Sequence, residues 1–189
     1  MGSIKADRLR THQVTLASDT VVLRPLTEDD WSLLLPWNND PEVLYLVEGD
    51  DVQSRTREEV QAIYRTVSQS AYCFVIEVAT INSATIAESS NVVTTRPAGA
   101  SRTVAVGECW LQEMNLQRLL DRYPGKALWR IDLMIGEKAY WGRGVGTKVI
   151  GMLVDFAFDR VGADLVFGCD IADHNTASLR AFQRNGFAV

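Results

Sequence analysis

The sequence predicts an α/β fold in which strands and helices alternate towards the C-terminus. Its composition suits a globular chain with a core, since 47% of its 189 residues are hydrophobic and 23% are charged. The last third runs strand, helix, strand, helix, an order that gives right-handed crossovers and locally parallel strands. A glycine-rich segment, Trp141–Thr147, joins one of these strands to an amphipathic helix, which makes this turn the most informative part of the chain.

Apolar runs rich in β-branched residues predict the strands of the first half, and a turn pair, Ser18-Asp19, separates the first two. Thr27 and the acids after it are typical of a helix start, with Thr27 as the cap. That helix runs to about Trp37 and is shortened or kinked by Pro36. Ser54–Ser70 has the apolar spacing of a second helix. The predicted strands are Val14–Ala17, Val21–Leu26, Tyr72–Thr80 and Thr103–Met114; Asn38–Pro41 is interpreted as a loop before the apolar stretch Val43–Val47.

The same patterns predict the elements of the second half. Gly144–Arg160 is a helix, with a core face that includes Val149, Ile150 and Leu153. A second helix, Asn175–Arg184, ends at Asn185-Gly186, which is a good helix C-terminus. The predicted strands are Leu128–Ile135, Leu165–Asp170 and the beginning of another at Phe187–Val189; Asn115–Gly125 is a connector with helical character, and Gly136–Trp141 is a loop.

The chain is long enough for one domain, since a domain takes about 100–200 residues. We expect this domain to span residues 12–189, and residues 1–11 to be disordered or a cloning remnant. Residues 82–102 are rich in Ser, Thr, Ala and Asn. They are interpreted as a long insertion between two strands, mobile at its tip.

Several classes of protein are disfavoured by composition. No apolar run approaches the roughly 20 residues of a membrane helix, and no apolar stretch follows the basic N-terminus as in a secretory signal. The net charge of −5 disfavours nucleic acid and suits a cationic small molecule. The three cysteines, Cys73, Cys109 and Cys169, lack C-x-x-C spacing. We therefore expect buried thiols in a reducing, cytoplasmic compartment, with no metal site and no membrane contact.

The glycines of Trp141-Gly142-Arg143-Gly144-Val145-Gly146-Thr147 allow a tight turn that points successive N–H groups into one space. Those amides and the following helix N-terminus favour an anion, most naturally a pyrophosphate, and Arg143 and Lys148 add positive charge. The Walker pattern is absent, and the dinucleotide fingerprint would need a third glycine where Thr147 stands. A glycine-rich turn without a ligand remains the alternative at this point.

A second motif narrows the choice. Residues Asn175, Ser178, Arg180, Phe182, Arg184 and Gly186-Phe187 follow the glycine loop in the pattern Asn-x-x-Ser-x-Arg-x-aromatic-x-Arg-x-Gly-Phe. The two motifs together resemble the Gcn5-related N-acetyltransferase (GNAT) superfamily, from about Leu23 to Val189. The resemblance implies a mixed central sheet flanked by helices, with splayed strands that bind acetyl-CoA. It also implies the cofactor-binding residues Leu133, Met134, Ile135, Trp141, Gly142, Arg143, Gly144, Val145, Gly146, Thr147, Asn175, Ser178 and Phe182.

Within that superfamily, Trp129–Gly136 and Val21–Asp30 look similar to aminoglycoside 6′-N-acetyltransferases. The implied reaction is acetyl transfer from acetyl-CoA to a primary amine, with the 6′-amine of an aminoglycoside as the first acceptor and antibiotic resistance as the role. Acetylation of a protein N-terminus or of a siderophore amine is an alternative. A third alternative is a non-catalytic acyl-CoA-binding module.

An alkylammonium must lose a proton before it attacks a thioester, and a carboxylate can hold the cation and accept that proton. Asp132 is the first candidate, because it interrupts an apolar strand that leads to the glycine loop and matches the acid at this point in the aminoglycoside enzymes. The alternative is that Asp132 only pairs with Arg130, which shares its face of the strand. Glu108 on the neighbouring strand is the second candidate.

Two further expectations concern the substrate and the leaving group. Trp37 and Trp110 are candidates for the substrate cleft, since aromatic faces suit an amino sugar, with a core position as the alternative for each. The family's tyrosine general acid is replaced here by Phe182, which has no proton to donate. Tyr140 or a water then supplies the proton, or the thiolate leaves unassisted.

Overall fold

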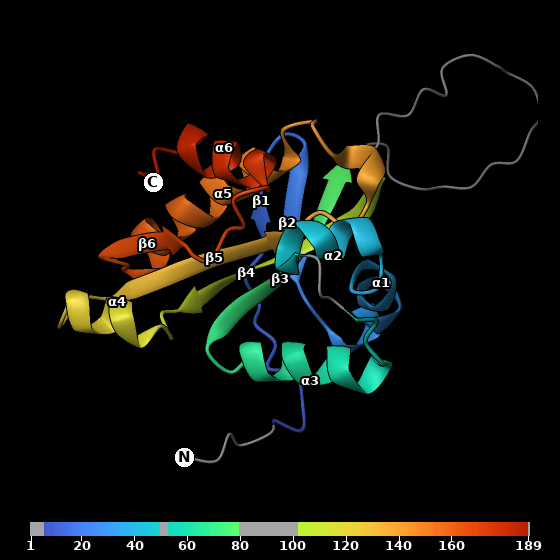
Figure 1. Cartoon of the computed structure of the whole chain (residues 1–189), viewed down its shortest axis with the longest axis horizontal. Helices are drawn as coiled ribbons and strands as arrows, with labels where there is room; N and C mark the ends of the chain where they lie inside the picture. The colour runs from blue at the N-terminus through green and yellow to red at the C-terminus, as the bar shows by residue number, and fades with distance from the viewer. Residues whose placement is uncertain (1–5, 50–52, 80–101, 189) are drawn as a thin grey trace, which may run out of the picture.

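The computed structural model describes residues 6–49, 53–79 and 102–188. Its centre is a six-stranded sheet in the order β1-β2-β3-β4-β5-β6, in which β5 and β6 are parallel and all the other neighbours are antiparallel. This mixed sheet confirms the predicted α/β class (Figure 1). The strands are β1 (Leu16–Ala17), β2 (Val21–Pro25), β3 (Ala71–Ala79), β4 (Thr103–Glu113), β5 (Leu128–Met134) and β6 (Leu165–Gly168).

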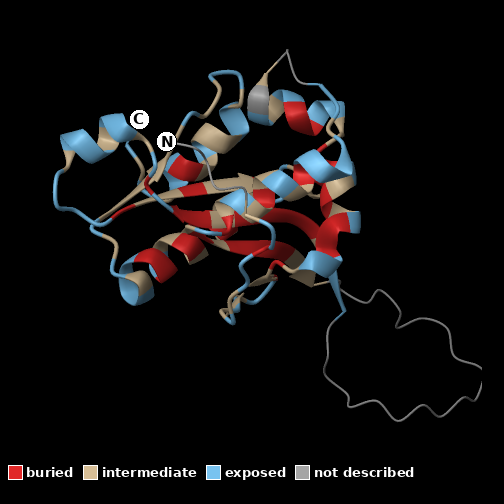
Figure 2. Ribbon diagram, turned by 90° about the horizontal axis from the view of Figure 1, so that it is seen from below, coloured by how far each residue is buried: buried red, intermediate tan, exposed pale blue. Residues whose placement is uncertain are grey.

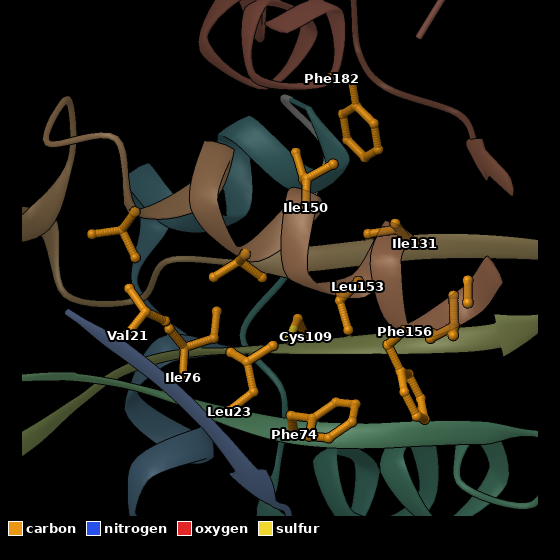
Figure 3. Packing of buried hydrophobic residues seen from close by; sticks show 14 of the residues in the cluster. Val21, Leu23, Phe74, Ile76, Cys109, Ile131, Ile150, Leu153, Phe156 and Phe182 are labelled. Carbon is orange, nitrogen blue, oxygen red and sulfur yellow. The ribbon is translucent and has the colours of Figure 1, made fainter. Parts of the chain in front are cut away.

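Helices cover both faces of the sheet and bury two apolar cores. On one face, Ile150, Leu153 and Phe156 pack over Leu23 and Phe74 of the strands (Figure 3). On the other face, a second cluster gathers side chains of α1 and α3, and Figure 2 shows the buried residues concentrated along the strands and the inner helix faces. The helices are α1 (Trp31–Trp37), α2 (Pro41–Glu48), α3 (Arg57–Val67), α4 (Gln117–Arg122), α5 (Val145–Phe156) and α6 (Thr176–Arg184), with short turns η1 (Glu28–Asp30), η2 (Lys138–Tyr140) and η3 (Ala157–Val161).

The structure differs from the sequence prediction at several places, and one is the N-terminal segment, where Leu9 is buried in the second cluster instead of lying in a disordered stretch. Pro41–Glu48 forms a helix, because Asp40 caps the amide groups of Glu42 and Val43 and Pro41 fits the first helical turn. The first strand is only Leu16–Ala17, and Phe187 packs edge-on against Phe182 at 4.9 Å between ring centroids instead of entering a strand. The predicted insertion, 82–102, lies outside the described residues except for Arg102.

β5 extends beyond its parallel neighbour. The β5–β6 pairs run from Leu128 opposite Leu165 to Ile131 opposite Gly168, whereas β5 continues to Met134. Beyond Ile131 the two strands therefore diverge, as the resemblance implies. The part of β5 after Ile131 is left facing the helices instead of a strand.

An irregularity in β4 brings this part of β5 close to its other neighbour. Ile76 pairs with Gly107 but Glu77 pairs with Ala105, so Val106 is an extra residue and forms a β-bulge. Gly107 lies so close to β5 that a Cβ there would stand 2.2 Å from the carbonyl oxygen of Met134. Within the described chain, no helix is long and apolar enough to cross a membrane.

Candidate active site

A pocket of about 380 Å³ opens where β5 and β6 diverge. Its walls come from the end of β5, the turn into α5, one face of α6 and the C-terminal part of α2. The predicted cofactor residues lining it are Leu133, Met134, Ile135, Trp141, Gly142, Gly144, Val145, Gly146, Thr147, Asn175 and Ser178. The structure thus brings the two sequence motifs together around one space.

The glycine loop forms the anion-binding end of this pocket. Gly142 and Gly144 have φ angles of +70° and +79°, which side-chain-bearing residues rarely adopt, and a Cβ at either would stand in open space. The first-turn residues of α5, Val145 to Thr147, line the pocket, and no side chain caps the helix, so their amides lack the partner that a cap provides. An open cradle of amides at a helix N-terminus fits a diphosphate.

Positive charge beside the cradle comes from residues that the sequence analysis did not single out as site residues. Arg180 and Arg184 line the pocket from one face of α6, four residues apart. Arg143 instead stacks on the Tyr140 ring at 5.4 Å. Lys148 turns away, because its Nζ pairs with Asp19 at 2.6 Å. The sequence feature that could have indicated this arginine pair is its spacing of four residues, with the small residues Ala177 and Ala181 on the same helix face.

Hydrogen bonds join the C-terminal part of α2 to the two residues that precede α6. Asn175 Nδ2 donates to the Leu46 carbonyl at 2.9 Å, while Asn175 Oδ1 accepts from the Ser178 amide at 3.0 Å. His174 Nε2 lies 2.9 Å from the Tyr45 carbonyl oxygen, and the two rings stack at 4.4 Å. The Asn175 side chain is therefore engaged by hydrogen bonds within the protein, and it forms part of the pocket wall.

A second pocket, of about 170 Å³, continues from the first on the α1 and α3 face of the sheet. Both pockets are lined by Leu46, Val47, Leu133, Met134, Asn175 and Ser178, so they lie side by side. The second pocket holds the predicted carboxylates, Glu108 and Asp132, and the predicted aromatic residue Trp110. Ligands bound in the two pockets would approach each other at the shared residues.

The carboxylate of Asp132 is fixed by two neighbours. Arg130 Nη2 donates to Oδ1 at 2.7 Å and Arg130 Nε donates to Oδ2 at 2.8 Å, while Trp110 Nε1 donates to Oδ2 at 3.0 Å. Burial lowers the pKa of Arg130, but its contact with Asp132 outweighs this and the pKa is raised overall. The Arg130 pairing considered as an alternative is therefore present, yet the Asp132 side chain keeps 24% exposure and lines the pocket.

Glu108 lies in a different environment from Asp132. The residue is only 4% exposed, and its carboxyl interacts with the hydroxyl of Tyr64 on α3. Burial raises the pKa of Glu108 well above its usual range, the charge of Asp132 raises it further, and the Tyr64 hydrogen bond lowers it. The second pocket thus contains one charge-paired carboxylate and one buried carboxyl with a high proton affinity.

The remaining candidates divide between pocket and core. Trp37 is a correction: it is 4% exposed, lines neither pocket, and donates from Nε1 to Glu137 at 2.9 Å. Its ring fills the space beside Gly136, where a Cβ would clash with it. Phe182 is buried in the wall of the second pocket against Gly168 and has no proton to give.

Asp170 is a pocket residue that the sequence analysis did not single out. It follows β6, has a φ of +54°, and lines the second pocket while pairing with Arg118 at 2.9 Å. Asp is among the few residues that tolerate this backbone region, which is enriched at functional sites. Cys169 beside it is half-buried, whereas Cys73 and Cys109 are buried as predicted.

Comparison with known proteins identifies the family. The family model for the acetyltransferase (GNAT) domain matches residues 20–188. The aminoglycoside N(6′)-acetyltransferases type 1 of Klebsiella pneumoniae and Serratia marcescens are each 24% identical over 174 residues, covering 92% of this chain and 77% of the relative.

Two solved structures share the fold. An aminoglycoside acetyltransferase in complex with coenzyme A has a TM-score of 0.59 at 18% identity, over 89% of this chain and 84% of that one. A spermidine N-acetyltransferase from Vibrio cholerae, in complex with coenzyme A and spermine, has a TM-score of 0.60 at 16% identity, over 90% and 82%. With the family model spanning most of its length and both motifs around one pocket, the chain belongs to the GNAT acetyltransferases and is an N-acetyltransferase that uses acetyl-CoA.

Proposed function

We propose that this acetyltransferase acetylates a cationic primary amine on an amino sugar, with the 6′-amine of an aminoglycoside as the first candidate. The observation that carries the proposal is the second pocket, which combines the carboxyls of Glu108, Asp132 and Asp170 with the indole of Trp110. Carboxylates and aromatic faces are the groups that bind ammonium ions. The relatives named for 6′-acetylation of aminoglycosides support the same acceptor.

Acetyl-CoA supplies an acetyl group activated as a thioester, and the first pocket offers what this molecule needs. We propose that the amides at Val145–Thr147 hold its diphosphate, with Arg180 and Arg184 beside them. Since β5 beyond Ile131 has no partner in β6, a backbone N–H of Leu133–Ile135 would donate to the acetyl carbonyl oxygen. Phe182 gives no proton, so Tyr140, which lines the first pocket, or a water would supply it, or the thiolate would leave unassisted. A thiol pKa of about 8.5 makes the thiolate a tolerable leaving group.

A panel of amines tests the acceptor class. The wild-type chain is incubated with acetyl-CoA and each amine, and the free thiol is measured. We expect turnover with an aminoglycoside that has a 6′-amine and none with a counterpart that has a 6′-hydroxyl. Turnover only with peptide N-termini would show that the acceptor is a protein and not an amino sugar. Tight binding of coenzyme A without turnover of any amine would show that the chain is not a catalyst.

The variant Asp132→Asn tests how the amine is held. Removing the carboxylate charge while keeping its shape should raise the KM for the amine by about tenfold or more, since a hydrogen bond to a charged group contributes about 1.5–3 kcal/mol. Affinity for coenzyme A, measured by calorimetry, should stay the same, because Asp132 lines only the second pocket. The control is Asp159→Asn, an exposed acid in η3 that lines neither pocket. An unchanged KM in Asp132→Asn would show that another group holds the amine.

A further inference from the structure

We propose that the two carboxyls have separate tasks: Asp132 anchors the acceptor ammonium, while Glu108 takes its proton and is held for this step by Tyr64 and Asn38. The inference rests on the proposed function, because it assigns roles in the acetylation of an amine. It concerns residues on four elements, β4, β5, α3 and the end of α1. Three lines of structural observation lead to it.

The first observation is the register of the strands. Both carboxyls line only the second pocket, but Glu108 lies opposite Met134, which lines both pockets, whereas Asp132 lies opposite Trp110, which lines only the second. Two residues along an antiparallel strand correspond to about 7 Å. Glu108 is therefore the carboxyl beside the junction where thioester and amine would meet, and Asp132 lies farther along the acceptor pocket.

The second observation is the bonding of Asp132. Its two oxygens already accept three hydrogen bonds, two from Arg130 and one from Trp110. A carboxylate that accepts two hydrogen bonds from a guanidinium and one from an indole is held in a fixed orientation. It still attracts an ammonium through its remaining lone pairs. This environment suits an anchor.

The third observation is the direction of a buried hydrogen-bond chain. Asn38 Nδ2 donates to the Leu34 carbonyl at 2.9 Å, and since a carbonyl only accepts, this fixes the orientation of the amide. The same Nδ2 donates to Tyr64 Oη at 3.0 Å. The one hydroxyl hydrogen of Tyr64 is then free to point to Glu108, which lines the same pocket and interacts with this hydroxyl. Tyr64 therefore donates to Glu108 and supports the ionised carboxylate.

The charges around Glu108 determine the sign of its response to pH. It is faced by Tyr64 from α3, by Cys73 from β3 and by Asp132 from β5, and Arg55 lines the same pocket. Burial and Asp132 raise the pKa of Glu108, which brings its proton affinity closer to that of an amine and makes the transfer less costly. An ammonium that enters the pocket favours the ionised form.

The proposed step moves the acetyl group from sulfur to nitrogen while the nitrogen loses two protons. The ammonium gives one proton to the Glu108 carboxylate, and the lone pair set free forms the N–C bond to the acetyl carbonyl carbon. The C–S bond breaks, and the electron pair leaves with sulfur. The second proton lost by the nitrogen ends on that sulfur, and Glu108 then returns its proton to solvent. The products are the N-acetyl amine and the free thiol.

Glu108→Gln is the direct test, measured with the amine that the wild-type chain turns over best. The amide keeps the size of the side chain and still accepts from Tyr64, but it does not take a proton. We expect kcat to fall by about a hundredfold or more with the KM for the amine unchanged, the opposite split from Asp132→Asn. The matched control is Glu113→Gln, at the exposed end of the same strand. Wild-type kcat in a folded Glu108→Gln protein would overturn the inference while leaving the proposed function intact, whereas a wild-type chain without turnover on any amine would overturn both.

Tyr64→Phe tests the positioning role and covers the case in which Glu108→Gln does not fold. Because the Tyr64 hydroxyl lowers the pKa of Glu108, its loss should raise that pKa, and the acid limb of the kcat profile should move to higher pH. We expect a shift of about one pH unit, or about tenfold slower turnover on the acid side, with the wild-type plateau regained at high pH. Tyr72→Phe, on the opposite face of β3, is the control and should not move the limb. A rate in Tyr64→Phe that is lowered equally at every pH, or an unmoved limb, would overturn the role of Tyr64.

Discussion

Replacement of Gly107 by alanine is expected to destabilise the fold by about 3 kcal/mol and to abolish most of the acetyl transfer. The added Cβ would stand 2.2 Å from the Met134 carbonyl oxygen and 2.9 Å from the Ile135 Cα. Both atoms belong to the backbone, so a side-chain rotation does not relieve the contact. β5 must move away from β4 at the point where it enters the active site.

The loss of acetyl transfer is expected because the contact between Gly107 and β5 lies between the two pockets' lining residues. Met134 and Ile135 line the first pocket, and Glu108, the next residue along β4, lines the second. Moving one strand against the other separates the proposed proton acceptor from the thioester site. Geometric errors of this kind reduce rates strongly even where every side chain is retained.

Thermal unfolding with and without coenzyme A measures the first effect. For a chain of this size, a loss of about 3 kcal/mol corresponds to a Tm lower by about 6–12 °C. The control is Gly125→Ala, where a Cβ meets nothing within 4 Å but the φ of +75° imposes strain. If the Tm of Gly107→Ala were no lower than that of Gly125→Ala, β4 and β5 would be able to move apart at little cost, and the prediction would be wrong.

Helices and strands could be predicted from the sequence wherever the pattern of apolar residues fits only one type of element. β3 and β5 are apolar runs with β-branched residues, and both are strands at the predicted positions. α5 follows its predicted core face, since Val149, Ile150 and Leu153 are all buried. The helix Pro41–Glu48 was missed although Asp40 and Pro41 are a cap and a first-turn residue, because the loop character of the preceding asparagines outweighed that signal.

Site residues could be predicted from the sequence where a charged residue interrupts an apolar strand. Asp132 breaks an apolar strand and Glu108 breaks the next one, and both line the second pocket. The prediction that Trp37 lines the substrate cleft was wrong, because an aromatic residue at a helix end fits a pocket and a core equally well. The core contact of Trp37 is with Gly136, which is distant in the sequence. Asp170 was missed because its left-handed backbone depends on the end of β6, which no local pattern reveals.

The largest expected effect on the first pocket comes from Gly144→Ala. We expect the Kd for coenzyme A to rise by about tenfold or more, which corresponds to about 1.4 kcal/mol of lost binding free energy. Two causes act together. The φ of +79° is strained for alanine, and the Cβ would occupy the open space of the cradle, where the diphosphate is proposed to bind.

Gly162→Ala separates these two causes. Gly162 ends η3, has a φ of +80°, and likewise has open space around the position of a Cβ, but it does not line either pocket. The two variants should therefore lose similar stability, about 1–2 kcal/mol, because the backbone strain is the same. Only Gly144→Ala should lose affinity in calorimetry with coenzyme A. Equal affinities in the two variants would mean that the glycines serve the turn and not the ligand, and the amides of α5 would no longer be the diphosphate site.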